Sequence, residues 1–150
     1  MYKNNFFMVK KEAESGKFYG YASVFNTEDS QGDIILNGAF HRTLKNNNEN
    51  IKLLLQHDRN SIIGETILLR EDVVGLYVEG RIYLEKQLGW NTFCFTKNNL
   101  LSGLSIGYRV NDFNHDAKGR RVIKSLDLFE ISIVSSPANR FSRIIYCKSK

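Results

Sequence analysis

The sequence predicts a mainly β protein with a few helices, a fold of the α+β class. Short runs rich in β-branched and aromatic residues recur along the 150 residues, and only two segments have helical character. The clearest run, VVGLYVEGRIYL at 73–84, places Leu76 and Val78 on one face and polar or aromatic residues on the other. This period of two is typical of a half-buried strand. Six or seven short strands interrupted by two helices favour an antiparallel barrel or a sandwich.

The other strands are expected in short runs on either side of this one. Apolar, aromatic or β-branched residues dominate each run, as is usual in strands. The last run is long enough for two strands or for one bent strand. In chain order, the expected strands lie at 18–25 (FYGYASVF), 51–56 (IKLLLQ), 61–69, 73–84, 104–110 and 121–135.

Two helices are expected between the strands. One covers residues 38–46, with Asn37 as its N-cap. The other covers 86–98, where aromatic residues recur at helical spacing, and Asn99 can end it in the left-handed conformation. Gly89 lowers the helix propensity of this second segment by about 1 kcal/mol.

Size and composition indicate a single domain over 1–150, with a core at about 17–145. Hydrophobic residues make up 42% and charged residues 25%, as is ordinary for a globular protein. No apolar run approaches the ~20 residues of a membrane span. The apolar patch FFMV at 6–9 is too short for a signal peptide. We therefore expect the protein to stay in the cytoplasm where it is made, without a role for a membrane.

The sequence offers no pattern for a metal or another cofactor. Cys94 and Cys147 show no CxxC spacing, so neither a zinc site nor a disulfide framework is indicated. Asp29, Asp33 and Asn37 do not have the spacing of an EF-hand loop. Local turns formed by Asx side chains, and the helix cap at Asn37, explain these three residues better. We expect no cofactor.

The charge pattern indicates a solvated surface more than a binding site for nucleic acid. The net charge is +5, but the 21 basic residues are spread along the chain in short clusters. Nucleic-acid interfaces concentrate such residues on one face. A positive surface favours an acidic protein partner equally well, so nucleic acid is not required.

The strongest local motif is LSGLSIGY at 101–108, in which glycines stand two residues before and after Ser105. It matches the G-x-S-x-G nucleophile elbow, which needs a helix after the serine. Here IGYRVNDF continues as a strand, and only His115 follows as a possible base, so an α/β-hydrolase is disfavoured. Two interpretations stay open. The glycines let a substrate backbone approach, or Ser105 is a buried serine in a glycine-softened strand.

His57 belongs to QHD at 56–58, directly after the apolar run at 51–55. An imidazole at the end of a core strand can point into a pocket and act as a general base near neutral pH. A capping or hydrogen-bonding role is the alternative. His41, in an amphipathic helix, and His115, in a polar loop, are interpreted as surface residues.

Glu130 stands inside the apolar stretch FEISIV. A carboxylate is costly to bury in such a strand unless it is paired. Its partner is either the imidazole N–H of a general base or a salt bridge to Arg109, Arg81 or a lysine. Asp127 is a second candidate for the acidic role, but it lies on the opposite face of the same strand.

Together, five segments resemble the phage prohead maturation proteases, which share a fold with the herpesvirus assemblins. The resemblance spans about residues 17–145 and implies a closed antiparallel β-barrel of about six or seven strands, flanked by two or more short helices. The segments are GYASVFNTEDSQGDIILNGAF (20–40), LLLQHD (53–58), GLYVEG (75–80), LSGLSIGY (101–108) and DLFEISIVSSPAN (127–139).

The resemblance also implies roles for single residues. Ser105 matches the nucleophile and His57 the general base. Glu130 occupies the position of the third catalytic member, where assemblins use a second histidine. The loop PANR follows where assemblins place their oxyanion loop, so backbone N–H groups near Asn139, together with Arg140, are the expected oxyanion donors.

The implied function is a serine endopeptidase of phage capsid maturation. It cleaves the scaffolding segment of the major capsid protein, and itself, inside the assembling prohead in the host cytoplasm, and a homodimer fits the resemblance. Two alternatives stay open: a capsid-assembly factor without catalysis, and a ligand-binding β-barrel. Family members often carry further residues after the core, so a short natural member and a self-trimmed product both fit a chain of 150 residues.

Overall fold

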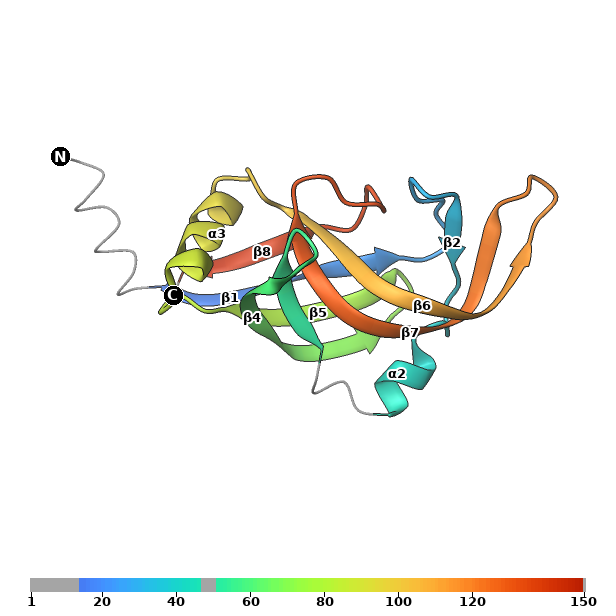
Figure 1. Cartoon of the computed structure of the whole chain (residues 1–150), viewed down its shortest axis with the longest axis horizontal. Helices are drawn as coiled ribbons and strands as arrows, with labels where there is room; N and C mark the ends of the chain where they lie inside the picture. The colour runs from blue at the N-terminus through green and yellow to red at the C-terminus, as the bar shows by residue number, and fades with distance from the viewer. Residues whose placement is uncertain (1–13, 47–50, 150) are drawn as a thin grey trace.

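The computed structural model describes residues 14–46 and 51–149, which form a curled sheet of eight strands and two short helices (Figure 1). The predicted class, mainly β with a few helices, is confirmed. The apolar patch at 6–9 lies outside the described residues. The strands are β1 (Glu14–Val24), β2 (Asp33–Ile35), β3 (Lys52–Leu55), β4 (Asp58–Glu71), β5 (Gly75–Ile82), β6 (Gly103–His115), β7 (Arg121–Val134) and β8 (Ile144–Ser149). The helices are α2 (His41–Lys45) and α3 (Gln87–Lys97).

The strand order is β2-β7-β3-β4-β5-β1-β8, and β6 pairs with β7. Most neighbours are antiparallel, but β7 runs parallel to both β2 and β3. β6 and β7 form a long hairpin that bends across the molecule (Figure 1). The expected bent strand at 121–135 is therefore the single strand β7, whereas the short strand β2 and the final strand β8 were not predicted.

The predicted closed barrel is wrong, because the sheet curls only into a half-barrel. β6 approaches the start of β8 at one isolated bridge, between Gly103 and Arg143. The backbone N–H of Leu104 donates to the Ser142 carbonyl there at 2.9 Å. Beyond this bridge β6 follows β7, and β8 follows β1. Closure would need β6 and β8 to pair along their lengths.

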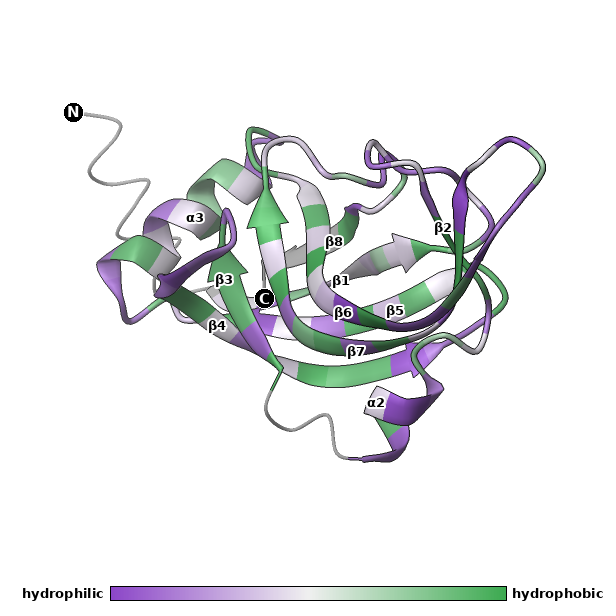
Figure 2. Ribbon diagram, turned by 45° about the vertical axis from the view of Figure 1, so that its right-hand side comes forward, coloured by the Kyte–Doolittle hydropathy of each residue, from purple (hydrophilic) through white to green (hydrophobic). Residues whose placement is uncertain are grey.

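The core lies on the inner face of the curled sheet. β5 shows the predicted alternation, since its apolar residues are buried and its intervening residues are partly exposed. Figure 2 shows hydrophobic and hydrophilic residues interleaved along the strands, with a hydrophilic tip on the β6–β7 hairpin. The largest fully buried side chains are those of Phe40, Phe93, Leu53, Ile63, Leu76, Ile82, Leu104, Ile123, Leu126, Ile131 and Ile133.

Helix α3 closes one end of the half-barrel. Trp90 and Phe93 are buried there with their ring centroids 6.0 Å apart. Asn99 has a φ of 58°, so the expected left-handed end is confirmed. A Cβ at Gly89 would overlap the carbonyl oxygen of Tyr83, so the glycine allows the helix to approach the end of β5. No helix in the described ranges is long and apolar enough to span a bilayer.

Helix α2 is shorter than predicted, and the N-cap predicted at Asn37 is wrong. The helix begins at His41, after a turn in which Gly38 has a φ of 94°. Phe40 occupies the cap position without a side-chain hydrogen bond. Instead, the carboxylate of Glu71, at the end of β4, accepts the backbone N–H groups of Gly38 and Phe40, both at 2.9 Å. The Glu71 carboxylate, from a strand distant in sequence, therefore takes the place of the N-cap side chain that was predicted at Asn37.

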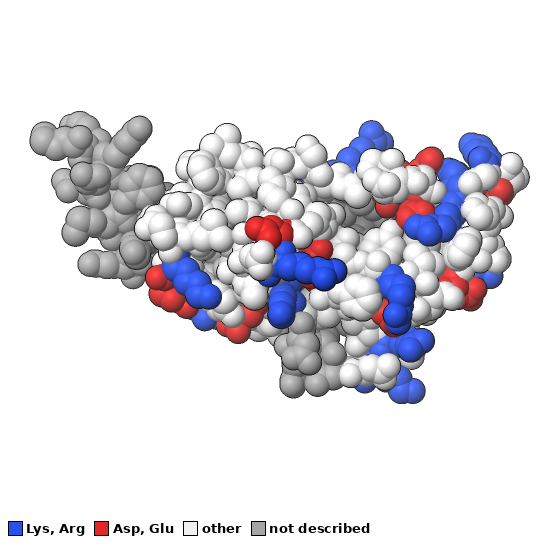
Figure 3. Space-filling view, viewed as in Figure 1, with Lys and Arg blue, Asp and Glu red and all other residues white. Residues whose placement is uncertain are grey.

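Charged side chains of both signs are mixed on the molecular face shown in Figure 3. Arginines are paired with nearby acids, as in Arg81 with Glu65 and Arg120 with Asp116. On this face the basic residues do not form the continuous stripe of a nucleic-acid interface.

Replacing Glu71 with alanine is expected to lower the free energy of unfolding by about 1–2 kcal/mol, because two N–H groups lose their charged acceptor. Urea unfolding followed by circular dichroism measures the change. Glu65→Ala is the matched control, since Glu65 forms an exposed pair with Arg81 and should cost less than about 1 kcal/mol. Equal losses in the two variants would show that the Glu71 carboxylate does not stabilise the turn.

Candidate active site

The register of β7 between its two neighbours sets which side chains meet. Ser105 of β6 lies opposite Ser132 of β7, and Gly107 lies opposite Glu130. On the other edge of β7, Leu54 of β3 pairs with Ser132. Directly paired residues project on the same side of a sheet. Ser105 and Glu130 therefore share one face, at the point where β3 ends.

His57 lies in a two-residue hairpin turn between β3 and β4. Gln56 and His57 have φ values of 51° and 60°, as a type I′ turn requires at both central positions. Such values are uncommon for residues other than glycine. Contacts with the end of β7 hold the turn: the Gln56 N–H donates to the Ile133 carbonyl at 3.0 Å, and the His57 N–H donates to Ser132 Oγ at 3.1 Å.

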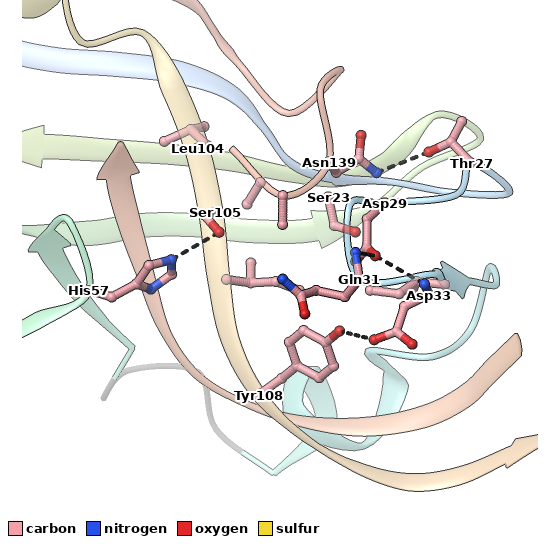
Figure 4. A pocket seen from close by; sticks show the side chains of 14 residues that line it. Ser23, Thr27, Asp29, Gln31, Asp33, His57, Leu104, Ser105, Tyr108 and Asn139 are labelled. Atoms are coloured by element: carbon pink, nitrogen blue, oxygen red, sulfur yellow. Dashed lines mark hydrogen bonds between the residues drawn. The ribbon is translucent and has the colours of Figure 1, made fainter. Parts of the chain in front are cut away.

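The imidazole of His57 connects the serine and the carboxylate. Figure 4 shows the ring directed at the Ser105 hydroxyl. The Nε2 atom lies 3.0 Å from Ser105 Oγ, and Nδ1 lies 2.5 Å from Glu130 Oε1. Because a carboxylate only accepts hydrogen bonds, Nδ1 carries the proton and Nε2 accepts the serine hydroxyl. Ser132 Oγ donates to the other carboxylate oxygen of Glu130 at 2.7 Å. This arrangement can transfer a proton from the Ser105 hydroxyl to His57.

The partner of Glu130, which the sequence left open, is His57. The arginines considered as alternatives are engaged elsewhere. Arg109 contacts Asp127 at 2.8 Å, and Arg81 contacts Glu65 at 3.2 Å. Asp127, the second acidic candidate, is thus joined to an arginine and not to His57.

The glycines around Ser105 make room for the protein's own groups. A Cβ at Gly107 would lie 2.9 Å from Cγ of Glu130, and one at Gly103 would lie 2.7 Å from Cδ of Pro137. Both distances are too short for real carbon contacts. Glycine is therefore needed at these two positions because Glu130 and Pro137 pack directly against them. β6 continues through Ser105 as a strand, in agreement with the argument against a nucleophile elbow.

Ser105 is only 7% exposed and opens into a cavity of about 220 Å³. The cavity extends from His57 towards the segment that joins β1 to β2. Ala138 and Asn139, from the loop after β7, complete its wall. The remaining lining residues are Ala22, Ser23, Thr27, Asp29, Gln31, Asp33, Ile35, Leu104, Ile106 and Tyr108.

Of the two expected oxyanion residues, only Asn139 lines this cavity. Its side-chain amide donates to Thr27 Oγ1 and to the Val24 carbonyl, both at 3.0 Å. The Arg140 guanidinium lies 4.7 Å from the ring centroid of Phe141, outside the cavity lining. Within the described ranges, the backbone N–H groups of Asn139 and Arg140 have no hydrogen-bond acceptor.

An ion pair beneath the cavity was missed by the sequence analysis. Arg121 donates from Nε and Nη2 to the two carboxylate oxygens of Asp33, each at 2.7 Å, and the Tyr108 hydroxyl donates to the same carboxylate at 2.9 Å. The Arg121 guanidinium holds the pKa of Asp33 below its ordinary value. Burial, together with the neighbouring Asp33, raises the pKa of Tyr108 well above that of a free tyrosine.

The local-turn interpretation is confirmed for Asp29 and wrong for Asp33. Asp29 Oδ1 accepts the backbone N–H groups of Gln31 and Asp33, at 2.8 and 3.0 Å. The side chain of Asp33 instead pairs with Arg121, which lies 88 positions away in sequence. Ser132 was also missed, although its position two residues after Glu130 indicated that both face the same side.

The remaining histidines lie away from this site. His41 and His115 are exposed, as expected, although His115 ends strand β6 where a loop was predicted. In the part of the chain that the structure describes, no three His, Cys, Asp or Glu side chains cluster so as to hold a metal ion.

A serine, a histidine and a carboxylate joined in this order on a curled β-sheet define a protein of the serine-peptidase class. The family model of the caudovirus prohead serine proteases matches residues 5–150, and the chain belongs to that family.

Two curated relatives agree with this assignment, and solved structures share the fold. The prohead protease of Enterobacteria phage HK97 is 34% identical over 142 residues, and that of Escherichia phage T5 is 33% identical over 146. These matches include 92% and 94% of this chain but only 63% and 68% of the relatives. The capsid assembly protease of bacteriophage T4 shares the fold with a TM-score of 0.64, at 12% identity, covering 81% of this chain and 82% of that one.

The fold also resembles that of the KSHV protease, solved in complex with a hexapeptide phosphonate inhibitor. The TM-score is 0.57 at 11% identity, over 88% of this chain and 64% of that one. The expected likeness to herpesvirus proteases is therefore confirmed for the fold.

Replacing Asp33 with asparagine is expected to destabilise the protein in a pH-dependent way. Because its pKa is lowered on folding, the ionised Asp33 stabilises the fold above the unfolded value of 3.8, and this contribution is lost as pH falls through the lower folded value. The difference in unfolding free energy between the unaltered protein and Asp33→Asn should be largest above about pH 5 and should shrink towards about pH 2.

Urea unfolding at a series of pH values measures this difference. Asp112→Asn, at an exposed position on β6, is the control for loss of a carboxylate. A difference for Asp33→Asn that stays constant across the series would contradict the role of the ion pair.

Proposed function

We propose that this chain is a serine endopeptidase of phage capsid maturation that cleaves the scaffolding segment of the major capsid protein, and itself, inside the prohead. The observation that carries the proposal is the hydrogen-bonded series Ser105–His57–Glu130, in which Ser105 and His57 line a cavity. Membership of the prohead protease family supports the same activity. The chain spans about two thirds of the curated relatives, so their full activity is carried over here as part of the proposal.

In the proposed mechanism, His57 Nε2 takes the proton of the Ser105 hydroxyl while Oγ attacks the scissile carbonyl carbon. Glu130 accepts the Nδ1–H hydrogen bond, which keeps the reactive tautomer and stabilises the imidazolium. His57 then gives the proton to the leaving amine nitrogen as the C–N bond breaks. Water, deprotonated by the same imidazole, hydrolyses the acyl-enzyme and restores Ser105.

The tetrahedral oxyanion needs donors beside Ser105. We assign this role to the backbone N–H groups of Asn139 and Arg140, which have no acceptor within the described ranges and belong to the loop that borders the cavity. Such a donor typically contributes ~3 kcal/mol to transition-state stabilisation. The exposed Arg140 side chain has no part in this proposal. The Asn139 side chain, bonded to Thr27, fixes the loop.

The partner in this proposal is the major capsid protein with its scaffolding segment, and the site of action is the assembling prohead in the host cytoplasm. A homodimer is proposed by analogy with assemblins alone.

Co-expression with the matching major capsid protein tests the activity. We expect the capsid protein to lose its scaffolding segment with the unaltered chain and to keep its full mass with Ser105→Ala or His57→Ala. Intact-mass spectrometry of the capsid protein is the measurement. Full-length capsid protein beside an unaltered chain that is folded and bound to it would favour a non-catalytic assembly factor.

Replacing Glu130 with glutamine is expected to lower kcat by about 10²- to 10⁴-fold, because the amide no longer fixes the His57 tautomer. Cleavage rates of a peptide that spans the mapped site measure the effect. Asp127→Asn is the matched control, since it removes a carboxylate from the same strand without touching His57. If both variants lost the same activity, Glu130 would have no specific role.

A further inference from the structure

The cavity beside Ser105 contains one carboxylate, that of Asp29, without an ion pair of its own in the described ranges. Asp29 and Asp33 both line it, and Arg121 is committed to Asp33 through two hydrogen bonds. Asp29 forms no ion pair with any described residue, and no lysine or arginine is among the lining residues. Two carboxylates and one guanidinium leave a net charge of about −1 in this region when all are ionised.

Two backbone hydrogen bonds orient the Asp29 carboxylate through one of its oxygens and leave the other oxygen without a donor among the described residues. Its Oδ1 accepts the N–H groups of Gln31 and Asp33, whereas Oδ2 accepts no hydrogen bond from the described part of the chain. The side chain is half-buried, and burial raises the pKa of this carboxyl group. A partly dehydrated carboxylate with an unused oxygen favours a cationic donor, which offsets the cost of its burial.

A second polar group in the cavity also has no partner. Ser23, on β1, is only 2% exposed and lines the cavity. Its hydroxyl forms no side-chain hydrogen bond with a described residue, and it lies near Asp29 in the cavity wall (Figure 4). Most buried side-chain polar groups are hydrogen-bonded. The Ser23 hydroxyl is therefore available to a polar ligand group in the cavity, independently of Asp29.

The size and position of the cavity restrict what this ligand group is. A volume of about 220 Å³ is smaller than the ~300–1,000 Å³ of pockets for drug-sized molecules, and it suits a single side chain. Ser105 and His57 form part of the cavity lining. A side chain that fills it therefore belongs to a residue next to the peptide bond that reaches Ser105.

We propose that Asp29 is the specificity-determining residue of this peptidase, and that the cavity takes a lysine or arginine side chain of a substrate residue flanking the scissile bond. Asp29 Oδ2 accepts from the cationic group, and the Ser23 hydroxyl supplies a second acceptor. The inference rests on the proposed peptidase function and names the class of substrate for that site.

The test uses peptides that contain the bond cut in the capsid protein, as mapped from the fragment masses. Each of the two flanking positions carries lysine, glutamine or glutamate in turn. With the unaltered chain, lysine at one of the two positions should give a kcat/KM at least about tenfold above glutamine. With Asp29→Asn this preference should disappear, whereas the neighbouring Glu28→Gln should keep it, because Glu28 pairs with Arg120 outside the cavity lining.

Asparagine keeps an oxygen for the N–H groups of Gln31 and Asp33, so Asp29→Asn should fold. Labelling of Ser105 by a small fluorophosphonate, which needs no side chain in the cavity, should proceed at the unaltered rate in this variant. A lysine preference that is absent at both positions, or that persists in Asp29→Asn, overturns the inference and leaves the peptidase function standing. Absence of any cleavage by the unaltered chain overturns the proposed function and this inference together.

Discussion

The position of β7 between β6 and β3 is the constraint on which the site depends. Its antiparallel register with β6 places Ser105 beside Ser132, and its parallel register with β3 brings the His57 turn to the same face. A slip of one residue would turn Glu130 towards the core and expose Ile131. Since an unpaired carboxylate is costly in an apolar core, the hydrophobic pattern of β7 and the polar contacts of Glu130 select the same register.

The His57 turn shows how a strained conformation is maintained by neighbouring structure. Two non-glycine residues with positive φ are unfavourable in isolation. The end of β7 compensates, because Ile133 and Ser132 accept both N–H groups of the turn. Ser132 also donates to Glu130, so one buried hydroxyl contacts both the His57 turn and the Glu130 carboxylate. A proposed active site built from paired strands in this way is organised before substrate binds.

The sequence predicted features whose cause is local or periodic. The alternation along β5 and the burial of Trp90 and Phe93 follow from spacing alone. Ser105, His57 and Glu130 were each ambiguous by themselves, and only the resemblance joined them. The Arg121–Asp33 pair and the capping of α2 by Glu71 join segments far apart in the chain, so no local pattern could show them. The closed barrel was implied by the resemblance and is wrong, because closure depends on how long β6 and β8 stay paired in this chain, which shared motifs do not determine.

The proposed nucleophile and the acidic part of the cavity belong to different segments of the fold, and two hydrogen bonds join these segments. Ser105 and Glu130 lie on the β6–β7 hairpin, whereas Asp29 lies in the β1–β2 connection. The Ser30 N–H donates to the Ala138 carbonyl at 2.9 Å, and the Asn139 amide donates to Thr27. The proposed specificity segment and the proposed oxyanion loop therefore share a hydrogen-bonded border. A side chain that displaced the β1–β2 connection would also displace the N–H groups near Asn139. The proposed selection of the side chain and the proposed stabilisation of the oxyanion are thus physically coupled.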